Sequence, residues 1–146
     1  MPNSEEISLF IRRAQETYTV ACELHQNHHY NDAVSRAYYS MFYAAKAVLL
    51  TKGIISRTHR GTISQLNINF VLEGELEETV WKYLPMSDTL IQEADYSITK
   101  RITQKESEEI LEGVNIFVKR CKTLLSQKRN HHDFYIKYFV VALPHL

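Results

Sequence analysis

The sequence predicts an all-α protein, an antiparallel up-and-down bundle of about five helices with a kink or break near Pro85. Three observations lead to this fold class. Apolar residues recur at steps of three and four along most of the chain, which is the period of a helix with one buried face. Glycine and proline number only 4 and 3, so the elements are long. The connections between them are short, which makes successive helices antiparallel neighbours.

The first two helices are predicted from one apolar stripe each. The stripe over residues 7–24 predicts a helix that ends near Gln26, where the chain becomes polar. Asn31 or Asp32 is expected to cap a second helix that runs to Gly53, because glycine commonly ends helices. The second helix is apolar on more than one side, so we expect it at the centre of the bundle.

The second helix also has apolar residues outside its core stripe. Tyr43, Ala47 and their neighbours are too apolar for a face in contact with solvent. Such a face predicts a twofold contact between two copies of the chain. We therefore expect a homodimer.

Two further helices follow a connector at residues 54–61. The third helix is expected to end at Gly74, and a fourth begins near Glu75. Pro85 then interrupts the pattern, because proline lacks the backbone N–H and clashes with the preceding helical turn. Since the apolar spacing resumes at Leu90, we expect the helix to kink or restart there.

The last predicted helix has the clearest pattern. Thr103 and Glu106 match a capping box, and apolar residues keep helical spacing over 110–125. We assign residues 1–127 to the bundle and residues 128–146 to a separate tail.

The tail has a different composition from the bundle. After a polar, basic start, 10 of the 13 residues over 134–146 are apolar, without a helical stripe. We expect the tail to dock on an apolar patch of the bundle or of a second subunit. The alternative is a loosely ordered segment that is prone to aggregation.

Composition and charge exclude several classes of protein. Lysine plus arginine and aspartate plus glutamate number 17 each, so the net charge is zero. This excludes a strongly basic nucleic-acid binder but allows a local basic patch. No apolar stretch is long enough to span a membrane, and the N-terminus lacks the apolar core of a signal peptide. We expect a cytoplasmic protein with no membrane partner.

No metal and no cofactor are expected. Cys22 and Cys121 lie in apolar helical patterns and are interpreted as small buried side chains. Adjacent histidines at 28–29 and 131–132 have no third ligand at a fixed spacing, which a zinc site would need. Nucleophile elbows, phosphate-binding loops and dinucleotide fingerprints have no match either.

A set of polar and aromatic residues remains as the candidate site. Its members are Arg36, Tyr39 and Tyr43 in the second helix, Arg57, His59 and Arg60 in the connector, and Asp95 and Tyr96 late in the fourth helix. The steps of three and four between the residues of the second helix place them on one face.

Two interpretations of this set are open. In the structural one, Arg36 pairs with Asp95 inside the bundle, and His59 caps a helix or lies in solvent. In the functional one, the set is an anion or nucleotide site with Lys46 at its rim. Arg57, Arg60 and the N-terminus of the third helix then hold phosphate, and the tyrosines stack a base.

Residues 33–47, with the sequence AVSRAYYSMFYAAKA, resemble the small stand-alone HEPN domains of prokaryotes. Residues 52–61, the Ala94-Asp95-Tyr96 element and the glutamate-rich last helix agree with the same family. The resemblance covers about residues 4–127. It implies an all-helical bundle that pairs as a homodimer. Many such proteins are encoded beside a minimal nucleotidyltransferase, and some pairs act as toxin and antitoxin.

Some HEPN proteins of this kind are metal-independent ribonucleases. The resemblance implies for them a composite site at the dimer interface, built on an arginine followed by four to six residues and a histidine. In this sequence no arginine has a histidine at that spacing, and Leu90 is followed by Ile91 where relatives often have arginine.

These departures favour a binding module over an enzyme. The module would be homodimeric, would partner a nucleotidyltransferase in a toxin–antitoxin-like pair, and would hold a nucleotide or RNA. One alternative is a ribonuclease toxin that uses His59 with Arg36 or Arg57. The other is a ligand-free structural or antitoxin-like subunit.

Overall fold

The computed structural model describes the backbone of residues 4–142 and the side chains of residues 4–128. Over these residues the chain forms helices and no strands, which confirms the all-α prediction. The elements are α1 (Ser4–Gln26), α2 (Tyr30–Leu50), α3 (His59–Leu66), one π-helical turn η1 (Asn67–Val71), α4 (Glu78–Trp81), α5 (Tyr83–Tyr96) and α6 (Gln104–Ala142).

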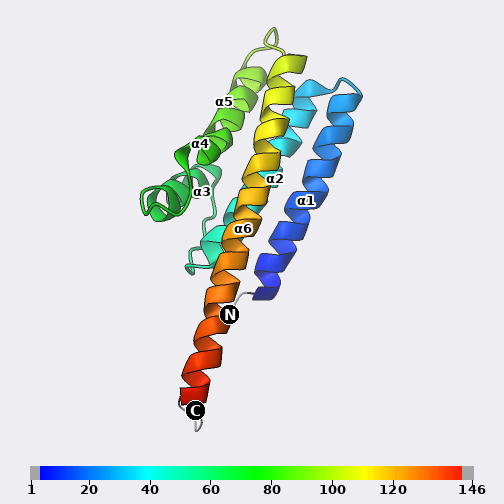
Figure 1. Cartoon of the computed structure of the whole chain (residues 1–146). Coiled ribbons are helices and arrows are strands. Elements are labelled where there is room, and N and C mark those ends of the chain that lie inside the picture. Colours follow the sequence, from blue (N-terminus) through cyan, green and yellow to red (C-terminus); the bar gives the residue numbers. More distant parts are fainter. Residues whose placement is uncertain (1–3, 143–146) are drawn as a thin grey trace.

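Helix α2 is the central element of the bundle. It packs against α1, α5 and α6, while the short α3–α4 segment lies to one side (Figure 1). Small residues permit a close contact with α1, where Ala14 and Ala21 are fully buried. The Ser40 hydroxyl donates a buried hydrogen bond of 2.6 Å to the Ala14 carbonyl, so it satisfies a polar group inside this contact.

The boundaries of the first two helices differ from prediction only at α2. Helix α1 ends at Gln26 as expected, whereas α2 begins at Tyr30 with His29 at the cap position. The Asn31 side chain accepts a 2.9 Å hydrogen bond from the Ile102 N–H instead of capping α2. The predicted cap is therefore wrong, because Asn31 serves a contact between the start of α2 and the connection from α5 to α6.

The middle of the chain has more breaks than the pattern predicts. Helix α3 continues into η1, and α4 begins three residues later than the expected Glu75. The break between α4 and α5 falls at Lys82, which places Pro85 in the first turn of α5. The missing N–H of a proline costs little there. The predicted break near Pro85 is confirmed, but the helix restarts at Tyr83, before the proline, and not at Leu90.

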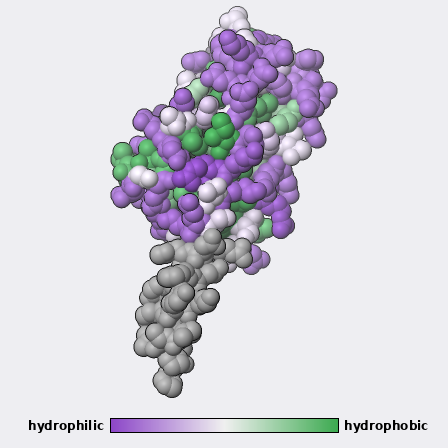
Figure 2. Space-filling view, in the orientation of Figure 1, coloured by the Kyte–Doolittle hydropathy of each residue, from purple (hydrophilic) through white to green (hydrophobic). Residues whose placement is uncertain are grey.

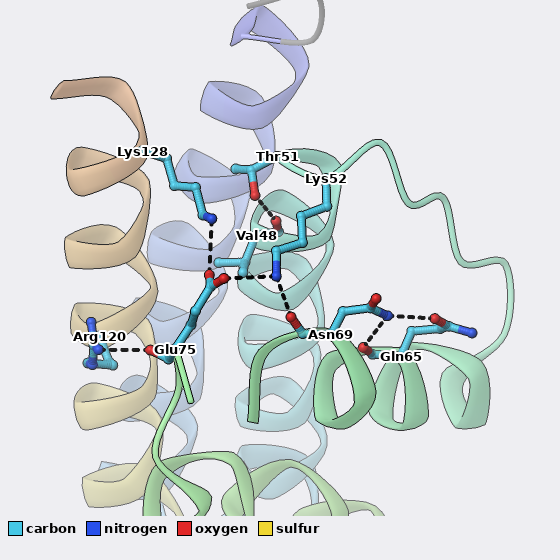
Figure 3. Close-up of polar contacts among 8 residues, drawn as sticks. All are labelled: Val48, Thr51, Lys52, Gln65, Asn69, Glu75, Arg120 and Lys128. Carbon is cyan, nitrogen blue, oxygen red and sulfur yellow. Dashed lines mark hydrogen bonds and ion pairs between the residues drawn. The ribbon is translucent and has the colours of Figure 1, made fainter. Parts of the chain in front are cut away.

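A network of ion pairs fixes the loop between η1 and α4 (Figure 3). The Glu75 carboxylate accepts from Lys52 Nζ at 3.0 Å and from Lys128 Nζ at 3.0 Å. Arg120 Nη2 donates to the Glu75 carbonyl at 3.0 Å, and its Nε lies 2.9 Å from Glu77. The loop is thus tied to the end of α2 and to the middle of α6.

Helix α6 begins as predicted but extends further. The Glu106 carboxylate accepts a hydrogen bond of 3.0 Å from the Thr103 N–H, and the Thr103 hydroxyl accepts one of 3.1 Å from the Glu106 N–H, which together form the predicted capping box. The backbone then stays helical through residue 127 as far as Ala142, and its last turns project beyond the bundle (Figure 1). The backbone of the predicted tail thus continues α6 from residue 128 to Ala142, and no glycine or proline interrupts the chain between Gly113 and Pro144. The expected docking concerns side chains outside the described residues.

Two kinds of feature are absent from the described residues. None of the helices there combines the length and the apolar composition that crossing a membrane requires. Histidine, cysteine, aspartate and glutamate form no group of three or more there that would hold a metal ion.

Candidate cation–aromatic site

Arg36 and Tyr39 form the first pair of the candidate site. The Arg36 guanidinium carbon lies 4.7 Å from the Tyr39 ring centroid, which is a cation–π contact. Arg36 is exposed and Tyr39 is half-buried, so both remain accessible from solvent. The spacing of three residues predicts this shared face correctly.

His59 lies against a wall of aromatic rings from α2. Its ring centroid is 4.8 Å from that of Phe42, 5.3 Å from that of Tyr38 and 5.5 Å from that of Tyr39. One side of the imidazole is exposed, so a ligand can reach it. His59 thus joins α3 to the face of α2 that carries Arg36.

The start of α3 is what places His59 there. Thr58 is the cap, and its hydroxyl accepts a 2.9 Å hydrogen bond from the Gly61 N–H. A Cβ at residue 61 would lie only 2.6 Å from the Thr58 hydroxyl, so the cap needs glycine at this position. Of the two structural alternatives for His59, the helix cap is wrong, because Thr58 takes that role, whereas the residue is exposed to solvent as the other alternative states.

Tyr38 has a buried hydroxyl with no hydrogen-bond partner among the described residues. Burial, then the nearby Asp88 carboxylate and Tyr39, raise the pKa of the Tyr38 phenol. An unpaired buried hydroxyl normally costs about 1–3 kcal/mol. In the described part of the chain, the Tyr38 hydroxyl is therefore the one buried side-chain group that lacks a hydrogen-bond partner, and a bound water or ligand could supply that partner.

Further contacts between cations and aromatic rings extend from Tyr39 along α2 to α1. Lys46 Nζ lies 5.2 Å from the Phe42 ring and 5.5 Å from the Phe10 ring. Arg13 lies 5.3 Å from the Tyr43 ring. A groove of about 450 Å³ opens beside Phe10, Arg13 and Tyr43. We call this whole set the cation–aromatic surface: Phe10 and Arg13 of α1, Arg36, Tyr39, Phe42, Tyr43 and Lys46 of α2, and His59 of α3.

The cation–aromatic surface has the chemistry of a platform for single-stranded nucleic acid. Aromatic rings stack on bases of any sequence, and neighbouring cations neutralise phosphates. The exposed Arg57 and Arg60 lie within two residues of His59 in the chain, and each carries a positive charge.

Asp95 and Tyr96 do not join this surface. Both are exposed at the end of α5, with Tyr96 90% exposed. The structural interpretation, in which Arg36 pairs with Asp95 inside the bundle, is wrong, because both side chains are exposed and no ion pair joins them. Arg36 contacts the Tyr39 ring instead.

The predicted twofold face of α2 is also wrong in part. Ala47 is fully buried against Ile7 of α1 and Leu50, so it has no surface left for a second copy. Tyr43 remains half-buried and belongs to the cation–aromatic surface.

Three contributors to the site are not among the candidate residues that the sequence pattern predicts: Phe10, Arg13 and Phe42. Phe10 and Arg13 are three residues apart, the same spacing as Arg36 and Tyr39, and this repeat was the available signal.

The fold and this surface define a small all-α domain with cations and aromatic rings gathered on one face. Comparison with known families is more specific: the model of the HEPN domain matches residues 7–124. The chain belongs to the HEPN domain family.

Relatives of similar length come from archaea. The chain is 40% identical over 123 residues to "Putative toxin MJ0605" of Methanocaldococcus jannaschii, which covers 84% of this chain and 91% of the relative. It is 34% identical over 123 residues to "Putative toxin MJ0142" of the same organism, over 84% of each chain. It is 41% identical over 101 residues to "UPF0332 protein PH1297" of Pyrococcus horikoshii, over 69% of this chain and 71% of the relative.

Proposed function

We propose that this HEPN protein is a homodimeric binding module that holds a nucleotide or single-stranded RNA on the cation–aromatic surface. Its protein partner in this proposal is a minimal nucleotidyltransferase, in a toxin–antitoxin-like pair. The proposal that a ligand binds here rests on the arrangement of Arg36, Tyr39 and His59 on one accessible face. The names of two relatives, "Putative toxin MJ0605" and "Putative toxin MJ0142", support the pair.

The arrangement supports binding because each part recognises a feature that all nucleotides share. Tyr39 and His59 offer ring faces for a base, and each stacked base contributes about 1–3 kcal/mol. Arg36 and Lys46 are placed over rings and keep their charge for phosphates. Such a surface discriminates little between base sequences, since every base has a ring face.

Binding of a fluorescein-labelled single-stranded RNA to the purified full chain tests this proposal. Tyr39→Ala is expected to weaken binding about 10- to 100-fold, as loss of one stacked base would. Arg101→Ala, at an exposed arginine in the α5–α6 connection, is the matched control and leaves binding unchanged. Equal affinity of both variants and the unchanged protein would refute the proposed surface.

The salt dependence of the same titration gives a second readout. If three cations of the surface contact phosphates, the logarithm of affinity falls against the logarithm of salt with a slope of about −2. Arg36→Ala should reduce the steepness of that slope, whereas Arg101→Ala should not. Binding without salt dependence would contradict a role for these cations.

The partner is tested with purified proteins. A minimal nucleotidyltransferase is titrated into the full chain, and the heat of binding is measured. Micromolar or tighter binding supports the pair, and no heat at 100-fold excess of either protein contradicts it.

A second candidate function is a metal-independent ribonuclease toxin. The specific observation is that His59, a general acid or base, and Arg36, a phosphate ligand, both contact Tyr39. RNA cleavage in the presence of a metal chelator, lost in His59→Ala, would establish this activity. Binding without cleavage assigns the surface to the first function.

A further inference from the structure

We propose that the groove between α5 and α6 is the docking site for a helix of a partner protein, one that carries apolar side chains flanked by lysine or arginine. The inference rests on the proposed function only for the existence of a protein partner, and it does not depend on nucleic-acid binding. Three observations carry it: the shape of the groove, its apolar floor and the charge at its rim.

The groove runs along α5 beside the first turns of α6 and has a volume of about 460 Å³. Its lining over residues 82–93 follows the helical period, so these side chains share one face: Lys82, Pro85, Met86, Thr89, Leu90 and Glu93. Residues 82–93 extend about 16 Å, or three helical turns. A groove of this length between two helices fits a third helix, whose side chains pack between theirs.

Tyr83 and Gly113 close the groove at one end. The ring of Tyr83 lies so near the α6 backbone that a Cβ on residue 113 would be only 2.2 Å from it. The two helices are therefore in close contact at Gly113 and leave space beyond it, beside Leu90 and Ile110. The groove follows from this packing of α5 on α6.

The floor of the groove is apolar and only partly covered. Met86 and Leu90 of α5 are half-buried, and Ile110 of α6 lies beneath them. Figure 2 shows hydrophobic residues gathered between α5 and α6 on this face. Of the 14 residues of α5, only Leu84 and Ser87 are fully buried. A further helix in the groove would remove the remaining apolar surface of α5 from water, which favours association.

The rim of the groove is acidic. Glu93 and Glu109 are exposed, and neither belongs to an ion pair among the described residues. Glu106 is half-buried and pairs with Lys100 at 3.6 Å. Lys82 is the one cation in the lining and lies about 16 Å along the helix from Glu93. Two carboxylates thus face a docked helix and attract lysine or arginine beside its apolar face.

The same features argue against other ligands. Carboxylates at the rim repel phosphates, so this groove is not a second site for nucleic acid. The groove is open to solvent along its length, whereas sites for small molecules enclose most of the ligand surface. A helix that is apolar on one face and basic beside it fits the floor and the rim together.

Binding of a synthetic peptide to the full chain tests the docking site. The probe is a fluorescein-labelled, alanine-based peptide of about 18 residues, with leucines at helical spacing and lysines on both sides of them. The control peptide has glutamate in place of each lysine. The lysine peptide should bind with a dissociation constant of about 100 μM or lower. The glutamate peptide should bind about tenfold more weakly or worse, because the attractions at the rim become repulsions.

Charge reversal at the rim places the peptide in the groove. At physiological salt, which screens distant charges, Glu109→Lys should weaken binding of the lysine peptide about fivefold. The same variant should strengthen binding of the glutamate peptide, a gain that a misfolded protein would not show. Glu108→Lys, at the neighbouring exposed glutamate outside the groove lining, is the matched control and should change either affinity less than about twofold.

Replacement of an apolar residue tests the floor. Leu90→Gln should weaken binding of the lysine peptide about fivefold or more, because a polar amide then faces the leucines. Leu72→Gln, at a 71% exposed leucine outside the groove, should leave it unchanged. Circular dichroism of each variant verifies that the helices are intact.

The outcomes separate this inference from the proposed function. Absence of binding by the lysine peptide, or equal effects of Glu108→Lys and Glu109→Lys, overturns the docking site. Groove variants that change the sedimentation of the full chain but not peptide binding overturn it too, because a second copy then covers the groove. RNA binding and the heat of nucleotidyltransferase binding, measured on the same samples, test the proposed function separately.

Discussion

The face built by α1 and α2 and the face built by α5 and α6 have opposite chemistry. The first carries Arg13, Arg36 and Lys46 against aromatic rings, whereas the second has an apolar groove with glutamates at its rim. Both belong to one bundle whose net charge is zero. A net charge of zero therefore does not exclude a local site for an anionic ligand.

The two faces also differ in what supports them. The cation–aromatic surface lies on α2, whose buried residues pack against α1, α5 and α6. The groove exists because α5 leaves space beside α6. We therefore expect the first face to be rigid and its supporting residues to be costly to change, and the second to tolerate substitution.

The largest difference in stability between the two regions is expected when one methionine in each is replaced by alanine. Met41 is fully buried in α2, whereas Met86 is half-buried in the groove. Met41→Ala should lower the free energy of unfolding by about 2–5 kcal/mol, because it leaves a cavity. Met86→Ala should lower it by about 1 kcal/mol or less. Urea unfolding of both variants, at a concentration too low for pairing, measures the difference, and equal losses would contradict the comparison.

The close contact that limits the groove gives the next effect. Gly113→Ala places a methyl group where the Tyr83 ring now lies, so the ring must move. We expect a loss of about 1–3 kcal/mol by thermal unfolding, as for other overpacked sites. Tyr83→Leu in addition should recover part of that loss. A neutral Gly113→Ala would show that α5 is free to shift on α6.

Helical periodicity explains why the fold was predictable. The end of α1, the capping box of α6 and the restart near Pro85 depend on residues close together in sequence. The shared face of Arg36 and Tyr39 has the same local origin.

The remainder of the site depends on contacts between distant elements. His59 meets the rings of α2 only because the Thr58 cap orients the start of α3, and no local pattern encodes that angle. Asn31 was expected to cap α2, but its side chain instead accepts a hydrogen bond from the backbone N–H of Ile102. The buried hydroxyl of Tyr38 depends on the packing around it, which periodicity does not specify.

A smaller effect concerns the ion pairs that fix the loop before α4. The hydrogen bond from Arg120 holds the pKa of Glu77 below its usual range. The folded state thus binds this proton less readily than the unfolded state, in which glutamate titrates near pH 4.3. The stabilisation is complete above that pH and is lost as pH falls through the lower folded value.

Replacement of the carboxylate isolates this contribution. Glu77→Gln should cost about 0.2–1 kcal/mol at pH 7, as exposed ion pairs do, and almost nothing at pH 2–3. Urea unfolding at both pH values measures this. Glu78→Gln, at the exposed neighbouring glutamate, is the control and should show no such pH dependence. A Glu77→Gln loss that persists at low pH would show that packing rather than charge is responsible.

The smallest effect on stability is expected from Tyr38→Phe, beneath the cation–aromatic surface. The hydroxyl is buried without a partner among the described residues, so its removal should leave the free energy of unfolding unchanged or raise it by up to about 1 kcal/mol. Ligand affinity is the more informative measurement. If the hydroxyl pairs with a bound ligand, Tyr38→Phe lowers the affinity for that ligand without lowering the stability of the free protein. A hydroxyl that pairs only with a bound ligand would be neutral in the free protein and would weaken RNA binding severalfold when removed. If Tyr38→Phe instead destabilises the free protein by 1 kcal/mol or more, the hydroxyl already has a partner there, such as a buried water, and the orphan group belongs to the scaffold rather than to the site.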